Sequence, residues 1–442
     1  MSAFAIGHIL LVVVTLSVAT AISGRAAGSL SALLVFCALY PRTITSFSGG
    51  PHAGISTSAP ELATYSLVLL LCWLIVPKSR ADYALLWIAL ITTPVFVFGF
   101  ATDWPLASNT IAGALQYAIA PLALLVGLRA ARGIDWSSPV NANRVVLTIA
   151  LIVAAQAGIS LLQLAGLDIN PVSATASEWV GSRVNGTSNH PNTLGKQLVL
   201  LTVILLPLSR ISSPRSRSLA TFTIVVALVL IALTGGRANF IGALLAVALW
   251  AIFLPTKRSA ARIATLTFLT IFAAAFASYF IERFQEDPTG GSRDRLTPVA
   301  FSLIRLAPIL GHGPNNYVQA ASNIDSYTSL TQLPVHNSVL LALAEVGVVG
   351  VAVLLGPVLI LTLRAVPMIR REGAPSDFAR GLVVLLPPVS LIALTGWGMV
   401  AGEILPLWMA TVGLLWGAAV PRRALQSRRP TRAGVGSRWV RP

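Results

Sequence analysis

Residues 336–363 read HNSVLLALAEVGVVGVAVLLGPVLILTL, and Glu345 is the only acidic or basic side chain in this run besides His336. A helix needs about 20 mainly apolar residues to cross a hydrocarbon core about 30 Å thick. This run is longer than a bilayer requires, so we expect a spanning helix that is tilted or that begins above the membrane surface. The run therefore indicates a membrane protein.

Twelve further apolar runs lie between charged, proline or glycine-rich interruptions, at 4–22, 26–41, 60–77, 83–100, 109–128, 145–165, 191–208, 218–234, 239–255, 263–281, 380–399 and 402–420. The composition agrees, since 55% of the residues are hydrophobic, 10% are charged and the mean hydropathy is +0.79, whereas soluble proteins carry about 25% charged residues. We predict an all-α polytopic membrane protein with 12 or 13 transmembrane helices, which form a single domain over residues 1–420. The arginine-rich segment 421–442 lacks apolar periodicity and should be a disordered basic tail, which either contacts anionic lipid headgroups or only anchors the topology.

The net charge of +16 is distributed unevenly over the loops. One set of alternate loops, with the tail, has 23 basic and four acidic residues, while the opposite set has eight basic and ten acidic residues. Because lysine and arginine accumulate in cytoplasmic loops, the first set should be cytoplasmic, and the charge reports topology rather than a nucleic-acid partner. Thirteen spans place the N-terminus outside, whereas a re-entrant segment among the first two would leave twelve spans and two cytoplasmic termini.

The predicted outer face has two long connections, 166–190 and 282–335, and the second is a large extracytoplasmic loop before the last three spans. Long polar loops are often functional. The sequence contains no GxxxxGK[ST], HExxH, CxxC or GxSxG motif, and Cys37 and Cys72 lie inside apolar runs without nearby metal ligands. We therefore expect no metal and no other cofactor.

Two outer segments place arginine or histidine next to turn residues. The first, SRVNGTSNHPN at 182–192, contains Arg183, Asn189 and His190, and it is either a capped helix start or part of an active-site lining. The second, TGGRANF at 234–240, holds Arg237 between two spans with almost no loop. A charge at this depth is costly, so Arg237 either binds a phosphate of a lipid substrate or extends to the headgroups.

The large outer loop contains two more such segments. In GSRDRL at 291–296, Arg293 and Arg295 offer paired guanidinium groups that suit phosphate oxygens, although Asp294 is close enough to hold one of them in an ion pair. In GHGPNNY at 311–317, His312 is more typical of a turn than of a catalyst, and we keep it as a residue that lines the site.

The start of the 336–363 run carries the most specific pattern. His336 and Asn337 at the start of a spanning helix place an imidazole at the outer surface, and Gly347 and Gly350 admit close helix packing. Glu345 lies about 13 Å deeper on the same helix. It is too far away to orient His336, and we expect a buried, hydrogen-bonded structural acid.

Together, the HN-x9-GxxG pattern at 336–350, the TGGR turn, GSRDRL and GHGPNNY resemble the O-antigen ligase and Wzy-type polymerase superfamily, best over 218–355, within a ligase-like core of about 180–355. Members of this family are multi-span enzymes that move a glycan from undecaprenyl diphosphate to an acceptor at the outer face of the cytoplasmic (inner) membrane. The resemblance implies that His336 matches the essential histidine, Arg237 the arginine between two spans, and Arg293 or Arg295 the arginine of the large loop.

These observations predict a metal-independent glycosyltransferase in which His336 is the general base and the arginines bind the diphosphate of the donor. Its partners would be an undecaprenyl-diphosphate-linked glycan, a glycan or lipid acceptor, membrane lipids and proteins of glycan export. The alternatives are a Wzy-type polymerase, which shares the donor half of the site, a transporter of bicarbonate or another small anion, and a scaffold of a glycan-export complex.

Overall fold

The computed structural model describes residues 3–40, 59–76, 108–167, 169, 180–181, 183–254, 259–286, 293–400, 402 and 404–420. Every regular element in these residues is a helix, which confirms the predicted all-α class. The predicted span at 83–100 and the predicted tail at 421–442 lie outside the described residues.

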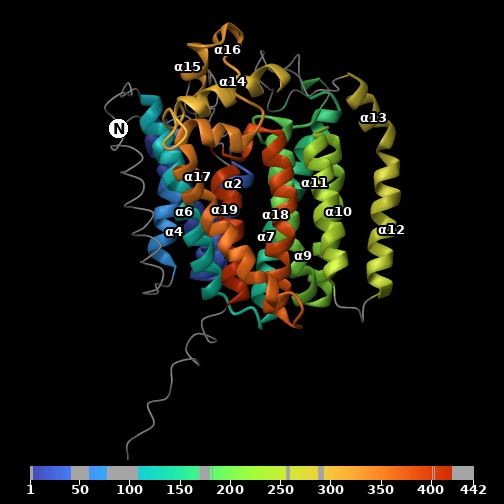
Figure 1. Ribbon diagram of the computed structural model, residues 1–442. Helices are drawn as coiled ribbons and strands as arrows, with labels where there is room; N and C mark the ends of the chain where they lie inside the picture. The colour runs from blue at the N-terminus through green and yellow to red at the C-terminus, as the bar shows by residue number, and fades with distance from the viewer. Residues whose placement is uncertain are drawn as a thin grey trace, which may run out of the picture.

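Most of the long helices run between the upper and the lower end of the bundle (Figure 1). Those of the first half are α1 (Ala3–Ser23), α2 (Arg25–Ala38), α4 (Ala59–Ile75), α6 (Ser108–Gly133), α7 (Pro139–Leu164) and α9 (Pro191–Ile211). Those of the second half are α10 (Pro214–Leu233), α11 (Arg237–Phe253), α12 (Ser259–Ala275), α13 (Ala277–Glu286), α14 (Arg293–Leu306), α15 (Tyr317–Ser322), α16 (Ser326–Thr331), α17 (Ser338–Ala365), α18 (Ala374–Thr395) and α19 (Ile404–Ala419). Two short 3₁₀ turns, η2 (Val366–Met368) and η3 (Trp397–Met399), follow α17 and α18.

Five of the described helices are long and apolar enough to cross a membrane, namely α7, α9, α10, α17 with its η2 extension, and α18. A sixth span results if the bent pair α12–α13 is counted as one. Shorter apolar helices, α11 and α19 among them, lie beside these spans. The protein is therefore a multi-pass membrane protein, and the total of 12 or 13 spans and the orientation stay predictions.

The centre of the bundle is formed by α9 and α19, in which nearly every residue is buried. Helix α19 packs closely on α6, where Gly413 and Gly417 face the backbone of α6 so closely that a Cβ atom at either position would clash with a carbonyl oxygen. Small residues allow this approach, which increases the van der Waals contact on which helix association in lipid depends. The starts of α9, α11, α17 and α19 all lie at the upper end of the bundle in Figure 1.

Helix α17 is broken at Gly347, whose φ of +63° and ψ of −175° are not helical. The backbone groups that the break releases are paired with the preceding loop: the carbonyls of Ala344 and Glu345 accept from the N–H groups of His312 and Gly313, and the N–H groups of Val348 and Val349 donate to the carbonyls of Pro308 and Ile309. Irregular backbone at membrane depth is tolerated only when the protein itself pairs it. The loop at 307–313 is therefore fixed against α17.

The predicted span at 263–281 is two helices rather than one, because α12 ends at Ala275 and α13 leaves it at an angle of 50°. Charged and apolar residues alternate in α13, where Glu282 and Arg283 stand between Ile281 and Phe284. Such an amphipathic helix is more stable at the membrane interface than in the hydrocarbon core. The bend places α13 at the upper end of the bundle in Figure 1.

Candidate functional site

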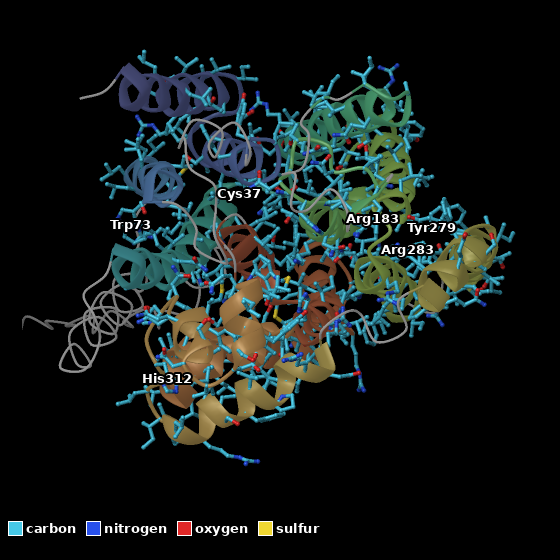
Figure 2. All side chains as sticks on the ribbon, turned by 90° about the horizontal axis from the view of Figure 1, so that it is seen from above. Cys37, Trp73, Arg183, Tyr279, Arg283 and His312 are labelled. Atoms are coloured by element: carbon cyan, nitrogen blue, oxygen red, sulfur yellow. The ribbon has the colours of Figure 1, made fainter. Side chains whose placement is uncertain are left out.

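Arg183 lies over the turn that joins α10 to α11. Its Nε donates to the carbonyl oxygen of Thr234 at 2.5 Å, and its Nη2 donates to Oδ1 of Asn192 at 2.7 Å. The turn itself requires Gly235, because φ is +61° there and a Cβ atom would lie 2.5 Å from the hydroxyl of Tyr279. The turn, Arg183 and Tyr279 are therefore in close contact, and Figure 2 shows Arg183 and Tyr279 on the same side of the molecule.

Arg237 is the first residue of α11, and it reaches across to α13. Its Nη1 donates to the carbonyl oxygen of Arg283 at 3.5 Å, and its guanidinium carbon lies 4.8 Å from the ring centre of Phe284. Arg283 is also an electrostatic neighbour of Arg183. Three arginines thus come together from a loop, a helix start and the bent helix α13, and we call Arg183, Arg237 and Arg283 the arginine cluster.

The positive charges of the arginine cluster act on one another. The pKa of Arg183 is lowered to about 10, mainly by burial and also by the positive charges of Arg283 and Arg237. Arg237 begins α11 and Arg183 bonds to Thr234 just before it, so the cluster lies near a helix N-terminus, where the helix dipole contributes partial positive charge. A phosphate at this end would be stabilised both by the helix N–H groups and by guanidinium forks. The arrangement is suited to bind a phosphate or diphosphate.

His190 has a structural position beside the arginine cluster. It is the N-cap of α9, and its Nδ1 accepts a hydrogen bond from the N–H of Asn192 at 3.0 Å, with Pro191 in the first helical position. Burial lowers the pKa of His190 to about 3, and the charges of Arg183 and Lys196 act in the same direction. The imidazole is therefore neutral at physiological pH. Asn189, which precedes it, is half-buried.

Three glutamines hold the loop that carries Arg183 and His190. Gln163 Oε1 accepts from the N–H groups of Asn185 and Gly186, and Gln156 Oε1 accepts from the N–H of Thr187. Gln197 Oε1 accepts from Ser188 Oγ at 2.7 Å. The backbone of 185–188 is thereby fixed from α7 and α9, which fixes the residues on either side of it. The sequence did not indicate these roles, and the only signal was three amides inside apolar spans.

His336 lies immediately before a firmly capped helix. Asn337 Oδ1 accepts from the N–H groups of Val339 and Leu340 at 2.9 and 3.0 Å. The next residue, Ser338, donates its N–H to the carbonyl oxygen of Gly396 at 3.1 Å. His336 is half-buried, so its imidazole stands at the end of the bundle on a rigid helix start that is attached to the turn between α18 and α19.

Lys196 connects α9 with the turn between α18 and α19. Its side chain is buried, and its Nζ lies so close to Gly398 that a Cβ atom there would clash with it. The same turn contacts Ser338. Helix α9 therefore has His190 and Asn192 at the arginine cluster and Lys196 at the turn that supports His336. Lys196 is six positions after His190, which corresponds to about 9 Å along the helix axis.

Arg295 belongs to a second group, on helices α14 and α16. Its guanidinium carbon lies 4.4 Å from the ring centre of Tyr327. Hydrogen bonds from Thr328 hold the pKa of Asp325 below its usual value, and the charge of Arg295 adds to this effect. Arg293 is the first residue of the same helix, α14. From the sequence we expected Arg237 and Arg293 or Arg295 to bind the same diphosphate. In the structure Arg295 contacts α16, whereas Arg237 contacts α13.

His312 and Glu345 occupy positions away from the arginine cluster. The Nε2 atom of His312 lies 2.9 Å from the carbonyl oxygen of Leu303, and in Figure 2 His312 is on the opposite side of the molecule from Arg183. Glu345 is 4% exposed and accepts a hydrogen bond from the Tyr117 hydroxyl at 2.9 Å. Gly350 is buried on α17. Within the described part of the chain, no three His, Cys, Asp or Glu side chains are grouped as metal ligands would be.

Comparison with known families identifies one part of the chain. Residues 222–355 match the family model for O-antigen ligase, Wzy_C, whereas no curated protein matches the chain. The matched segment runs from α10 to the middle of α17 and includes Arg237, Arg283, the three arginines of α14 and His336. It confirms the resemblance that the sequence motifs indicated over 218–355.

Proposed function

We propose that this protein is a membrane glycosyltransferase that transfers a glycan from a polyprenyl-diphosphate donor to an acceptor hydroxyl at the outer face of the cytoplasmic membrane. The observation that carries this proposal is the arginine cluster at the start of α11, two of whose members lie inside the O-antigen ligase segment. The family implies lipid-linked glycan substrates, and a diphosphate is the part of such a substrate that three guanidinium groups recognise.

The arginine cluster would stabilise the leaving group. When the bond between the sugar C1 and the phosphate oxygen breaks, negative charge grows on the departing lipid diphosphate. Preorganised donors aimed at such a charge are the largest single contribution to catalysis in many enzymes. Arg183 is held by Thr234 and Asn192, so its guanidinium does not have to be ordered when substrate binds.

His336 would accept the proton of the acceptor hydroxyl as that oxygen attacks C1. Histidine is the side chain most often used as a general base, because it exchanges a proton near neutral pH. Direct displacement at C1 inverts the anomeric configuration. In this mechanism the donor places its diphosphate at the arginine cluster and its C1 toward His336. We assign Arg293 or Arg295 to the outer side of the same donor.

The proposal is tested by reconstituting the protein in liposomes with a lipid-linked glycan and following transfer to the acceptor. We expect His336→Ala to reduce the rate about 10²- to 10⁴-fold. Arg364→Ala, at the opposite end of α17, is the control and should retain the rate. Undiminished transfer by His336→Ala, with an unchanged thermal unfolding midpoint, would refute the base assignment.

The same assay separates the ligase from the polymerase, because the two reactions differ in the acceptor. Transfer to a second copy of the lipid-linked glycan would identify a Wzy-type polymerase, and transfer only to a different glycan or lipid would identify a ligase. Arg237→Ala should reduce both reactions, since it acts on the donor. Full activity of that variant would contradict the role of the arginine cluster.

A further inference from the structure

A cleft of about 490 Å³ lies between helix α14 and the start of α16, and no residue of the arginine cluster lines it. One wall is α14, and the other is the turn between α15 and α16. Clefts that hold small ligands measure about 300–1,000 Å³, so this one has room for part of an oligosaccharide but not for a folded partner.

The walls of the cleft combine apolar surface with a few polar groups. Pro298, Val299, Leu306 and Ile324 form the apolar part, and Leu306 and Ile324 remain 68% and 49% exposed. A sugar ring has an apolar face of C–H groups and an edge of hydroxyls, so it covers such a wall while its hydroxyls meet polar side chains. A lipid chain would leave those polar side chains unpaired, at a cost.

Arg305 and Asp325 supply the polar contacts of the cleft. Arg305 forms no hydrogen bond or ion pair with any residue that the structure describes, and it lines the cleft from the last turn of α14. Asp325 Oδ2 accepts from both the N–H and the hydroxyl of Thr328 at 2.7 Å, which fixes the carboxylate. A cleft lined by both a carboxylate and a guanidinium is less suited to a bare phosphate than to sugar hydroxyls, which donate to the first and accept from the second.

The cleft is rigid. The opposite face of α14 is buried through Leu296, Ala300 and Leu303, and the carbonyl oxygen of Leu303 lies 2.9 Å from Nε2 of His312. The loop that holds His312 is in turn fixed to α17 by backbone hydrogen bonds. A preordered site binds without the entropic cost of ordering its side chains and loops.

The cleft lies on the same helix as the two arginines assigned to the outer side of the donor. Helix α14 begins with Arg293 and Arg295, and Ser302 in the cleft wall is seven residues after Arg295, or about 10 Å along the helix. Arg295 also contacts Tyr327, two residues after Asp325. With Arg293 or Arg295 on the outer side of the donor, as assigned above, the sugars that follow the diphosphate would lie beside the second half of α14.

We propose that this cleft binds the sugars of the donor glycan that follow the diphosphate, and that it selects donors by the length and identity of those sugars. This inference rests on the proposed glycosyltransferase function. It assigns Arg305, Asp325 and Ser302 to substrate selection, apart from the groups that act at the reacting bond.

The test compares two donors on the same lipid diphosphate, one with the complete glycan and one with a single sugar. Ser302→Trp fills the cleft, and Arg305→Ala removes its cation. Leu330→Trp, at a position on α16 that is 85% exposed and does not line the cleft, and Arg364→Ala are the matched controls. We expect Arg305→Ala to raise the KM for the complete donor about 10-fold or more, the effect of losing one charge-assisted hydrogen bond. Ser302→Trp should raise the same KM because it occupies the space of the sugars. Both variants should leave the KM for the single-sugar donor unchanged.

Three results would overturn the proposal: unchanged KM values in the cleft variants, an equal rise for both donors, or a rise in the KM of the acceptor alone. If the unmodified protein transfers no glycan, the proposed function fails independently. Binding of the free oligosaccharide to the purified protein then still tests the cleft. Binding that Ser302→Trp abolishes and Leu330→Trp preserves would support it, and no binding to the unmodified protein would refute it.

Discussion

The half-buried histidine at the start of α9 should make the bundle sensitive to acid. Burial, with Arg183 and Lys196, lowers the pKa of His190 to about 3 in the folded protein, while an unfolded chain keeps the ordinary value near 6.5. Between these two values the unfolded state binds more protons than the folded state. The contribution of His190 to stability is therefore complete above pH 6.5 and is lost progressively as the pH falls toward 3.

The size of the effect follows from the pKa difference. Each pH unit inside this window costs about 1.4 kcal/mol for one proton, so at pH 5.5 the loss is about 1.4 kcal/mol relative to neutral pH. A loss of 1 kcal/mol lowers the unfolding temperature of a chain of 150–250 residues by about 2–4 °C and that of a longer chain by less. We therefore expect a decrease of about 1–3 °C.

The assay is thermal unfolding of the purified protein in detergent at pH 7.5 and at pH 5.5, for the unmodified chain and for His190→Asn. Asparagine also accepts from the N–H groups of a first helical turn, so the variant keeps a cap but removes the titrating group. Other groups titrate equally in both proteins and cancel in the comparison. An equal decrease on acidification in the two proteins would refute the reasoning.

Three further results are expected. Gly347→Ala should give little folded protein by size-exclusion chromatography, because a Cβ atom there would clash with the carbonyl oxygen of Ile309 at a φ of +63°; a normal monodisperse peak would contradict this. Tyr117→Phe should cost about 1–3 kcal/mol, measured as a lower unfolding temperature, because Glu345 loses a hydrogen bond in a buried site; an unchanged temperature would show that the bond is dispensable. Arg283→Ala should raise the KM for the lipid-linked donor about 10-fold or more, and an unchanged KM would remove Arg283 from the donor site.

Much of the helical framework could be predicted from the sequence, because a bilayer imposes a simple rule on each segment. Every predicted span except 83–100, which lies outside the described residues, coincides with a helix or a helix pair. The cap at His190 was also predictable, since an N-cap followed by proline is a local pattern. These features depend on residues that are close in the sequence.

The assembly of the site depends on contacts between distant segments, and the sequence could not predict it. Arg283 joins Arg183 and Arg237 only because α13 bends by 50° from α12, whereas a straight span would point it elsewhere. Lys196 meets Gly398 across some 200 residues of sequence. No local spacing encodes either contact.

The most direct test of the arginine cluster is the affinity of the purified protein for undecaprenyl diphosphate, measured for the unmodified chain, Arg237→Ala and the control Arg364→Ala. Loss of a charge-assisted hydrogen bond corresponds to about 1.5–3 kcal/mol, or about a 10- to 100-fold weaker Kd. We predict this loss for Arg237→Ala, a smaller loss when the ligand is the monophosphate, and no change for the control. Equal Kd values for all three proteins would contradict the assignment of this site to the donor diphosphate.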